Sequence, residues 1–447
     1  MNIDFLFETF RKNKDLTALV WNGKKITYQF FIDQTELWAE KFKEEGISAG
    51  KVVSLEGDFS PNCISLFLAL IAKDCIIIPQ SNTNRVGREI KDKLSQVETY
   101  IYCDENDNVT WESTDLVSNH PYYSKLNKIK KPGLVLFSSG TSGDPKAAVH
   151  DFSLLLEKFK MDRRTFTTLN FLLFDHWGGL NTMLHTLSNA GTIVTAKNRS
   201  PDEIGKLIQE NEIQLLPATP TFLNLMLLSG ISSKYNLSSL EVITYGAEPM
   251  LQTTLMRLKK AFPKIKLQQT YGLIEVGVLR TKSKEDDSLW LKVGGEGYQT
   301  RVVEGILHIK TKSTILGYLN ADTPMSKDGW FITGDSVEED GEYLKILGRK
   351  SEMINVGGEK VFPTEIENII LTMNNVSDVM VYGEKNPIIG SLICAKVCLL
   401  EHEDQKDFSK RLKQLCLQKL DRFKVPVKII ITDQALFGDR FKKSRTL

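Results

Sequence analysis

One stretch of the chain, from Leu134 to His150 (LVLFSSGTSGDPKAAVH), constrains the fold more than any other. It opens with the apolar run Leu134–Phe137, which predicts a buried strand, and continues into hydroxyl-bearing residues and glycines that end at Lys146. Small residues let backbone N–H groups converge on an anion, the hydroxyls add donors, and the lysine supplies a positive charge. The stretch therefore predicts a strand that leads into a phosphate-binding loop.

This loop does not have the spacing of a Walker loop. A Walker loop needs a second glycine, a lysine and a serine or threonine at fixed distances after its first glycine. Counted from Gly140, the glycine position holds Pro145 and the hydroxyl position holds Ala147, so only the lysine fits. An ordinary Gly/Ser turn after a strand is the other interpretation of such a motif, but the length of the string favours phosphate binding.

The string SSGTSGDPK resembles the phosphate-loop signature of the adenylate-forming superfamily, which contains acyl-CoA synthetases, carrier-loading adenylation domains and luciferases. The resemblance implies that the loop holds the β- and γ-phosphates of ATP, and that its threonine also lies beside the magnesium ion. The residues it assigns to phosphate are Ser138, Ser139, Gly140, Thr141, Ser142, Gly143 and Lys146.

The length and charge of the chain set further bounds. Its 447 residues exceed the size at which one hydrophobic core stops growing, so we expect at least two domains. A hydrophobic share of 41% and a charged share of 25% are typical of a globular protein. The net charge of +1 gives no field that would attract nucleic acid or an anionic membrane surface. Partners must therefore be argued from individual sites.

No segment suggests a membrane or an oxidising compartment. The start lacks a signal-peptide core and no window is apolar over the length of a bilayer span, so we expect a cytoplasmic protein. The six cysteines are scattered through apolar surroundings, as expected of reduced, buried thiols. Cys394 and Cys398 could form half of a metal clip, but no second pair of ligands lies nearby, and core packing is the favoured interpretation.

Strand-like and helix-like segments alternate through the first part of the chain, as in doubly wound α/β folds. A helix is expected over Pro61–Lys73 and a buried strand over Cys75–Pro79. Residues 104–133 are polar and rich in lysine, which predicts an irregular surface connection. The apolar run Phe171–Phe174 predicts another strand, and the residues after it would lie where ligands bind in an α/β sheet.

The rest of the chain changes character twice. Short strands and turns from Gly305 to Gly348 predict a β-rich subdomain, and the later pattern predicts a compact mixed segment. The predicted organisation is a large domain of doubly wound sheets over residues 1–348 that includes the subdomain at 305–348, a hinge at 349–351 and a small mobile C-terminal α+β domain over 352–447.

Further strings carry the resemblance to the adenylate-forming superfamily. QTYGLIE resembles its Y-G-x-T-E motif, in which the tyrosine stacks on adenine and the glutamate, here Glu275, holds magnesium. Ile274 stands at the threonine position, so a hydroxyl expected near the α-phosphate is missing. FITGD matches the motif whose aspartate binds the ribose hydroxyls. The residues assigned to the adenylate are Gly246, Ala247, Glu248, Tyr271, Gly272, Asp335 and Arg349.

The end of the chain, ALFGDRFKKSRTL, matches the family least well. The family places its adenylating lysine in a G-K-x-x-R-like string, and alignment on Arg445 assigns that role to Lys442, with Phe441 in place of the glycine. Alignment on Phe441 assigns it to Arg440, and Lys443 is the next basic residue. We assign Lys442; a solvated basic tail is the other interpretation.

The resemblance also assigns the acid and thiol sides of the site. His176 resembles the family histidine that flanks the carboxylate and gates the thiol, and Trp177 and Tyr245 are expected to line the acid pocket. Asp175 follows a phenylalanine, as does the aspartate that binds the α-ammonium in amino-acid-activating domains, so an amino acid substrate remains open. The family rotates its small domain after adenylation, which would bring Gly357 and Gly358 beside the thiol.

Taken over nearly the whole chain, the resemblance implies an ATP-dependent ligase that joins a small carboxylic acid to coenzyme A through an acyl-adenylate, with Mg²⁺ and release of pyrophosphate. One alternative is an adenylation enzyme that loads an amino or hydroxy acid onto the phosphopantetheine arm of a carrier protein. The other is a non-catalytic nucleotide-binding relative, suggested by Ile274 and the irregular terminus. The string after Arg349, KSEMINVGGEKVFPTEIE, is closely similar to that after the hinge of acyl-CoA synthetases and favours coenzyme A as the acceptor.

Overall fold

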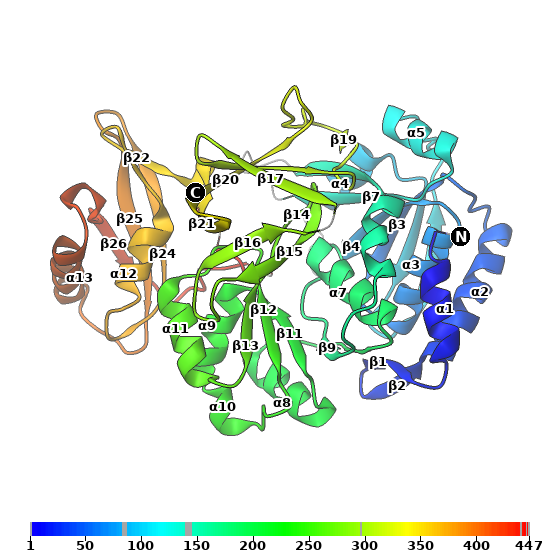
Figure 1. Ribbon diagram of the computed structural model, residues 1–447, viewed down its shortest axis with the longest axis horizontal. Helices are drawn as coiled ribbons and strands as arrows, with labels where there is room; N and C mark the ends of the chain where they lie inside the picture. Colours follow the sequence, from blue (N-terminus) through cyan, green and yellow to red (C-terminus); the bar gives the residue numbers. More distant parts are fainter. Residues whose placement is uncertain are drawn as a thin grey trace.

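The computed structural model describes residues 2–82, 87–138, 145–295, 297–438, 440–443 and 445. Within these residues the strands form four sheets. Figure 1 shows helices α1 and α2 (blue) at one end of the long axis and the C-terminal sheet with its helices (orange to red) at the other. The predicted class, a large α/β part with a β-rich region and a small C-terminal domain, is confirmed.

The first α/β sheet contains the strand that leads to the predicted phosphate loop. Its central strands are parallel, while β7 and β8 pair antiparallel with Ser138 opposite Lys146. The loop therefore closes a hairpin, whereas a Walker loop leads from a strand into a helix. In sheet order the strands are β19 (Gly317–Tyr318), β8 (Lys146–Asp151), β7 (Gly133–Ser138), β4 (Ile76–Ser81), β3 (Val52–Gly57), β5 (Thr99–Cys103) and β6 (Val109–Ser113).

The second α/β sheet brings two glycine turns together. Strands β12 and β13 are parallel neighbours, and Tyr245 pairs with Gln269 at their carboxyl ends. A Cβ at Gly246 would lie 2.5 Å from Thr270 Oγ1, so only glycine fits there. In sheet order the strands are β13 (Lys266–Gln269), β12 (Val242–Tyr245), β11 (Leu215–Ala218), β9 (Thr167–Leu169), β10 (Thr192–Val194), β1 (Thr17–Trp21) and β2 (Lys24–Thr27).

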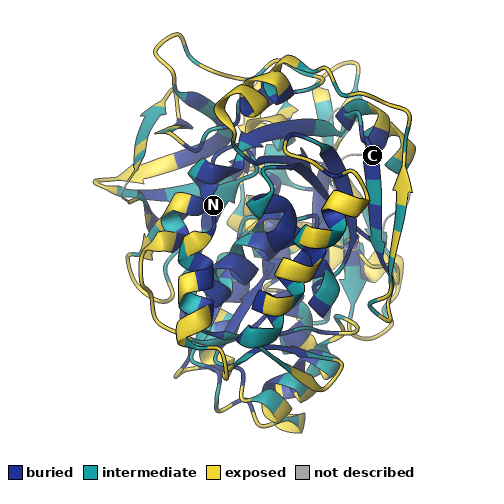
Figure 2. Ribbon diagram, turned by 90° about the vertical axis from the view of Figure 1, so that its right-hand side faces the viewer, coloured by how far each residue is buried: buried dark blue, intermediate teal, exposed yellow. Residues whose placement is uncertain are grey.

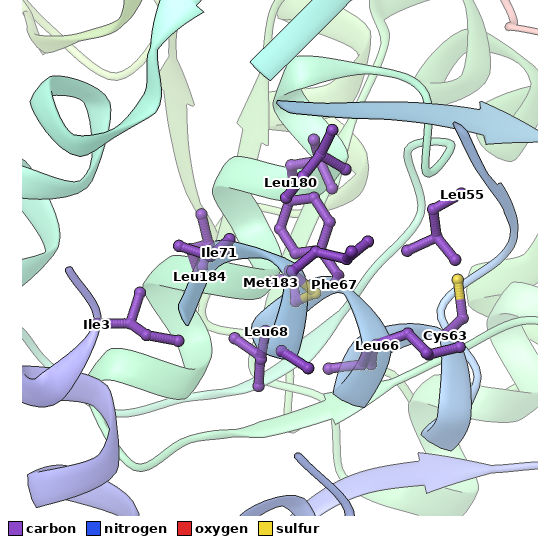
Figure 3. Packing of buried hydrophobic residues seen from close by; sticks show 14 of the residues in the cluster. Ile3, Leu55, Cys63, Leu66, Phe67, Leu68, Ile71, Leu180, Met183 and Leu184 are labelled. Atoms are coloured by element: carbon purple, nitrogen blue, oxygen red, sulfur yellow. The ribbon is translucent and has the colours of Figure 1, made fainter. Parts of the chain in front are cut away.

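Helices α3 (Pro61–Ala72) and α7 (Trp177–Ser188) belong to a hydrophobic cluster that takes in strands of both α/β sheets. Residues Cys63–Ile71 of α3 are all buried, as expected of a helix that is apolar on every side. Figure 3 shows side chains of α3, including Phe67 and Leu68, close to Met183 and Leu184 of α7. This packing holds the start of α7 in place. Figure 2 shows the exposed residues on the outer faces of the surrounding helices.

The other helices of the large domain cover the two sheets. Helix α2 begins after Thr27, whose side chain accepts a hydrogen bond from Phe30 N, as a threonine N-cap does. The remaining elements are α1 (Asp4–Lys12), α2 (Tyr28–Glu44), α4 (Arg88–Ser95), α5 (Pro121–Ile129), α6 (Phe152–Leu156), the 3₁₀ turn η1 (Glu157–Lys160), α8 (Pro201–Asn211), α9 (Pro220–Ser229), α10 (Ile231–Lys234) and α11 (Gln252–Ala261).

Two segments differ from the expectation drawn from the sequence. The connection expected over residues 104–133 contains β6 and α5, because α5 buries only Tyr123 and Leu126 and its period is hidden among lysines. The run Phe171–Phe174 forms no strand: β9 ends at Leu169, and Phe174 packs edge-on against Phe59 and Phe67 instead of joining a ladder. The apolar character of Phe171–Phe174 therefore reflects burial and not membership of a strand.

The third sheet is antiparallel and runs from Tyr271 to Arg349, so it starts earlier than the predicted β-rich subdomain at 305–348. Asp335 and Arg349 are cross-strand partners in it. In sheet order the strands are β14 (Tyr271–Leu273), β15 (Gly277–Ser283), β16 (Trp290–Gly294), β21 (Tyr343–Arg349), β20 (Phe331–Asp340), β18 (Ile306–Thr311) and β17 (Tyr298–Val303).

The C-terminal domain has its own sheet and its own hydrophobic cluster. All six cysteines are free thiols, and Cys394 packs in a small apolar cluster beside Tyr382. No helix of the described part has the length and apolar character required to cross a bilayer. The elements are η2 (Lys350–Glu352), β22 (Ile354–Val356), β23 (Glu359–Val361), α12 (Pro363–Ile370), β24 (Val376–Asn386), β25 (Gly390–Leu399), α13 (Gln405–Lys419), η3 (Arg422–Lys424) and β26 (Lys428–Ile431).

Candidate active site

His176 is the N-cap of helix α7. Its Nδ1 accepts a hydrogen bond of 3.0 Å from Gly178 N, so the proton of the neutral ring lies on Nε2. Burial lowers the pKa of His176 well below its usual range, and the charges of Lys442 and Arg440 lower it further. At pH 7 the imidazole is therefore neutral and offers one N–H donor.

The C-terminal tail, by which we mean the described residues 436–438, 440–443 and 445, reaches the start of α7. It forms a tight hairpin, in which Phe437 pairs with Lys443 and Phe441 N donates to Gly438 O over 2.8 Å. The hairpin and the loop before α7 enclose a cavity of about 10 Å³, enough for roughly one water molecule. Its lining residues are Phe171, Leu172, Leu173, His176, Arg199, Arg440, Phe441 and Lys442.

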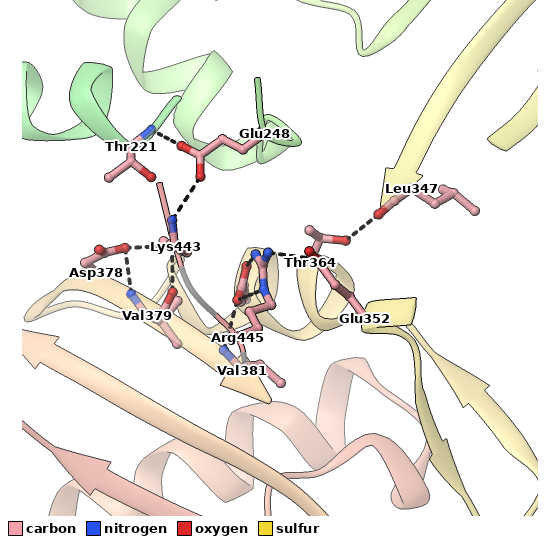
Figure 4. A network of polar contacts seen from close by, with 11 residues as sticks. Thr221, Glu248, Leu347, Glu352, Thr364, Asp378, Val379, Val381, Lys443 and Arg445 are labelled. Atoms are coloured by element: carbon pink, nitrogen blue, oxygen red, sulfur yellow. Dashed lines mark hydrogen bonds and ion pairs between the residues drawn. The ribbon is translucent and has the colours of Figure 1, made fainter. Parts of the chain in front are cut away.

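The basic residues of the tail point to different places. Lys443 Nζ lies 2.8 Å from Asp378 Oδ1 and donates to Val379 O, inside the C-terminal domain (Figure 4). Arg440 Nη2 lies 2.6 Å from Asp175 Oδ2. Among the described residues, the carbonyl of Lys442 accepts a hydrogen bond from Gly438 N (3.3 Å), but its side chain forms no hydrogen bond or ion pair. Its ammonium is thus available at the cavity that His176 lines.

The charge state of Lys442 is set by its surroundings. Burial lowers the pKa of Lys442 to about 8, Glu248 opposes this, and Arg440 and Arg349 add to the lowering. A lysine with this pKa is mostly protonated at pH 7 but loses its proton readily when the pH rises. A cation near its titration point beside a neutral histidine is typical of an active site.

Three carboxylates hold the rest of the tail, those of Glu367, Glu352 (3.2 Å from Arg445 Nη1) and Glu248. Arg445 Nη2 lies 2.8 Å from Glu367 Oε2, and Glu367 is fully buried. Burial raises the pKa of Glu367, but the charges of Arg445 and Lys443 outweigh it and leave the pKa below its ordinary value. Glu248, assigned to the adenylate, accepts hydrogen bonds from Thr221 N (2.7 Å) and Lys443 N (3.3 Å). Its carboxylate therefore joins the tail to the start of α9.

Asp335 lies at the centre of a second group of predicted residues. Tyr271 Oη donates to Asp335 Oδ2 over 2.5 Å, and Arg349 Nε lies 2.9 Å from Asp335 Oδ1. Burial raises the pKa of Asp335, and the charge of Arg349 offsets only part of this. The structure brings these three residues, from β14, β20 and β21 of the antiparallel sheet, together.

Glu275 and Lys146 meet through a residue that the sequence did not single out. Tyr318 Oη donates to Glu275 Oε1 over 2.5 Å, and Lys146 Nζ lies 5.6 Å from the centre of the Tyr318 ring. The backbone beside Glu275 is held by His150, whose Nε2 lies 2.8 Å from Ile274 O. Ser138 ends β7 opposite Lys146. The other phosphate residues, Ser139, Gly140, Thr141, Ser142 and Gly143, lie outside the described residues.

The described residues contain no group of three or more His, Cys, Asp or Glu side chains that could hold a metal ion alone. Mg²⁺ is commonly bound by one or two carboxylates together with substrate phosphates. A single carboxylate, Glu275, near the phosphate-loop lysine fits that pattern.

Trp177 and Tyr245, expected in the acid pocket, are both buried. The Nε1 of Trp177 and the hydroxyl of Tyr245 have no hydrogen-bond partner among the described residues. The sequence did not point to Lys158 as a residue with distant polar contacts. Its Nζ donates to Asn181 Oδ1 (2.7 Å) and Val278 O (2.8 Å). Burial lowers the pKa of Lys158 to about 8. The only signal in the sequence was a lysine beside the apolar face of a helical segment.

Gly357 and Gly358, assigned to the thiol side, form the exposed turn between β22 and β23 with φ of 62° and 96°. In the part of the chain that the structure describes, no heavy atom other than those of the adjoining residues lies within 4 Å of the position that a Cβ would take at either residue. In this arrangement of the domains the tail with Lys442, and not the glycine turn, faces His176.

These features define a two-domain protein in which β7 and β8 flank the predicted phosphate loop and a basic tail lies at the start of α7. The model of the AMP-binding enzyme family matches residues 74–319, and that of the AMP-binding enzyme C-terminal domain matches residues 365–437. The first match alone covers more than half of the chain, and the chain belongs to this family.

Named relatives share modest sequence identity. The chain is 29% identical to the indoleacetate–CoA ligase of Aromatoleum aromaticum over 68% of this chain, and spans 64% of that relative. It is 25% identical to the 2-succinylbenzoate–CoA ligase of Listeria innocua over 96% of this chain and 95% of that protein.

Solved structures share the fold. The anthranilate CoA ligase AuaEII in complex with anthranoyl-AMP superimposes with a TM-score of 0.85 at 16% identity, covering 99% of this chain and 95% of the other. The ATP-bound MatB from Rhodopseudomonas palustris gives a TM-score of 0.81 at 20% identity, covering 98% and 97%. At these identities the likeness concerns the fold alone.

Proposed function

We propose that the chain is an ATP-dependent carboxylic acid:CoA ligase that works through an acyl-adenylate. Membership of the AMP-binding family supports the use of ATP, and relatives named CoA ligases support coenzyme A as the acceptor. The observation that carries the proposal is the position of Lys442, a half-buried cation with a pKa of about 8 that lines one cavity with the neutral His176.

The chemistry explains why such a site is needed. A carboxylate is a poor electrophile for a thiol because its oxygen does not leave. In the proposed reaction a carboxylate oxygen bonds to the α-phosphorus of ATP while the bond to pyrophosphate breaks, and the thiol then displaces AMP from the acyl carbon. Charge accumulates around the α-phosphate in the first step, so a cation fixed there lowers the barrier.

We assign roles to the chain's own residues on this basis. Lys442 neutralises charge at the α-phosphate, and the Nε2–H of His176 donates a hydrogen bond to the substrate carboxylate. Asp335 accepts hydrogen bonds from the ribose hydroxyls, and Tyr271 and Arg349 hold its carboxylate in orientation. Glu275 holds Mg²⁺, which would draw negative charge from the departing pyrophosphate when bound.

A carrier protein as acceptor is the less favoured alternative. The sequence supported this alternative through Asp175, which was expected to be able to bind the ammonium group of an amino acid substrate. In the structure Asp175 Oδ2 lies 2.6 Å from Arg440 Nη2, so the buried carboxylate already has a cationic partner. The reason for expecting an amino acid is therefore weakened.

The test is mass spectrometry of the protein with ATP, Mg²⁺ and a panel of fatty, aromatic, hydroxy and amino acids, with and without coenzyme A. We expect an acyl-adenylate without the thiol and an acyl-CoA with it, which would also name the acid class. An adenylate that persists in the presence of coenzyme A would point to a carrier protein. ATP binding without pyrophosphate release from any acid would support a non-catalytic relative.

A further inference from the structure

The ion pair between Arg440 and Asp175 joins the tail to the large domain. The two residues are 265 positions apart in the chain, and Nη2 and Oδ2 are separated by 2.6 Å. Asp175 is buried, and its other oxygen, Oδ1, has no hydrogen-bond partner among the described residues. Arg440 is thus the main partner of a carboxylate that is costly to leave alone.

Phe441, next to Arg440, fixes the backbone of the hairpin. It has a φ of 49°, a left-handed conformation that is uncommon for a side chain of this size. Its ring lies 5.4 Å from that of Phe171 and 5.2 Å from that of Phe222, and Thr219 Oγ1 donates to its carbonyl over 2.8 Å. The family's G-K-x-x-R-like string has a glycine at this position, and glycine adopts such a φ without strain. In this chain the aromatic packing of Phe441 stabilises the same backbone conformation.

The tail is therefore held on both sides of Lys442. Before it, Arg440 and Phe441 bind the large domain through Asp175 and an aromatic cluster. After it, the side chain of Lys443 binds Asp378 of the C-terminal domain (Figure 4), and that of Arg445 binds Glu367 of the same domain. Lys443 N also donates to Glu248 of the large domain. The side-chain contacts after Lys442 would therefore move with the C-terminal domain, whereas the contacts of Arg440, Phe441 and Lys443 N depend on how the two domains are arranged.

We propose that Arg440 is a positioning residue for adenylation: its ion pair with Asp175 docks the tail on the large domain, so that Lys442 reaches the reacting groups. The same ion pair must break before the C-terminal domain can turn toward thiol transfer. This inference rests on the proposed ligase function, and it makes Asp175 a docking partner instead of a substrate-binding residue.

The experiment measures the two half-reactions separately in the full-length protein. ATP–pyrophosphate exchange reports adenylation, and formation of acyl-CoA from a supplied acyl-adenylate reports thiol transfer. We expect Arg440→Ala to lower the kcat of exchange by about 10- to 100-fold, because a small misplacement of a catalytic group has effects of this size. The KM for ATP should change less than about 2-fold, and thiol transfer should be unchanged or faster.

Matched variants separate docking from folding. Arg440→Lys keeps a cation near Asp175 and should recover most of the exchange rate. Arg301→Ala removes an arginine from an exposed pair with Asp328, at 2.7 Å, and serves as the control for loss of a guanidinium elsewhere. Hydrogen exchange of the peptide that contains Lys442 should be faster in Arg440→Ala and unchanged in Arg301→Ala.

A double-mutant cycle on Asp175 and Arg440 is the most specific test of the proposal. If Arg440 acts through Asp175, the double variant Asp175→Asn/Arg440→Gln should be no slower in exchange than the worse single variant. Fully additive losses, a wild-type exchange rate in Arg440→Ala, or equal loss of both half-reactions would each overturn the proposal. Failure of the ligase function itself would look different, since the wild-type protein would then form no adenylate at all.

Discussion

The ribose side of the candidate site and its lysine side are built in different ways. Asp335 is held by Arg349, its cross-strand partner, and by Tyr271 from the same antiparallel sheet. Lys442 is held by a hairpin whose contacts divide between two domains. Groups within one sheet are positioned once the sheet has formed, but Lys442 is positioned only while the domains keep this arrangement. The ribose side should therefore serve both half-reactions, and the lysine side only one.

Lys442→Ala is the strongest test of this difference. We expect adenylation to fall by about 1,000-fold or more, because a cation aimed at developing phosphate charge is lost from a water-poor site. Thiol transfer from a supplied acyl-adenylate should stay nearly intact. Pyrophosphate exchange and acyl-CoA formation measure the two steps, and an equal loss of both would contradict the assignment of Lys442.

Arg445→Ala tests the part of the tail that stays with the C-terminal domain. It leaves Glu367 fully buried without its guanidinium partner, at a cost of about 3 to 5 kcal/mol in the free energy of unfolding of that domain. Hydrogen exchange of strand β24 as a function of denaturant measures the loss. Glu367→Gln in the same background should restore part of the stability, and a loss below about 1 kcal/mol would show that the pair contributes little.

Asp335→Ala tests the ribose side. Hydrogen bonds to a charged group contribute about 1.5 to 3 kcal/mol, so ATP should bind roughly 10- to 100-fold more weakly. Titration calorimetry measures the affinity, with Asp335→Asn as the variant that keeps the shape of the side chain. An unchanged affinity for the nucleotide would count against the ribose role.

The pH dependence of adenylation is the smallest of the expected effects, and it tests the lysine side of the site separately from the ribose side. Because the pKa of Lys442 is lowered to about 8, its cation is present below that pH and is lost as the pH rises through it. The kcat/KM for exchange should therefore fall above about pH 8, while kcat, which reports the complex with anionic ATP, should fall at higher pH. Lys442→Arg should abolish this alkaline limb, and thiol transfer should lack it.

Elements encoded by a local signal were predicted well, and those that depend on distant segments were not. The helix over Pro61–Lys73 and the strand over Cys75–Pro79 were predicted within a residue or two, because a Ser60–Pro61 cap and an unbroken apolar run encode them locally. The strand expected at Phe171–Phe174 was wrong, since an apolar run shows burial and not the presence of a ladder partner. Tyr318 and Lys158 were missed because each acts on a segment distant in sequence.

The sequence by itself determined the family and the order of the nucleotide-binding motifs, because each motif is a continuous string whose residue types carry its chemistry. Only the tertiary structure decided where the side chains of Arg440, Lys442 and Lys443 lie and which cation is the partner of Asp175. Neighbouring basic side chains are nearly equivalent in sequence. Which domain each one faces depends on a hairpin packed between segments that the chain brings together over 265 residues.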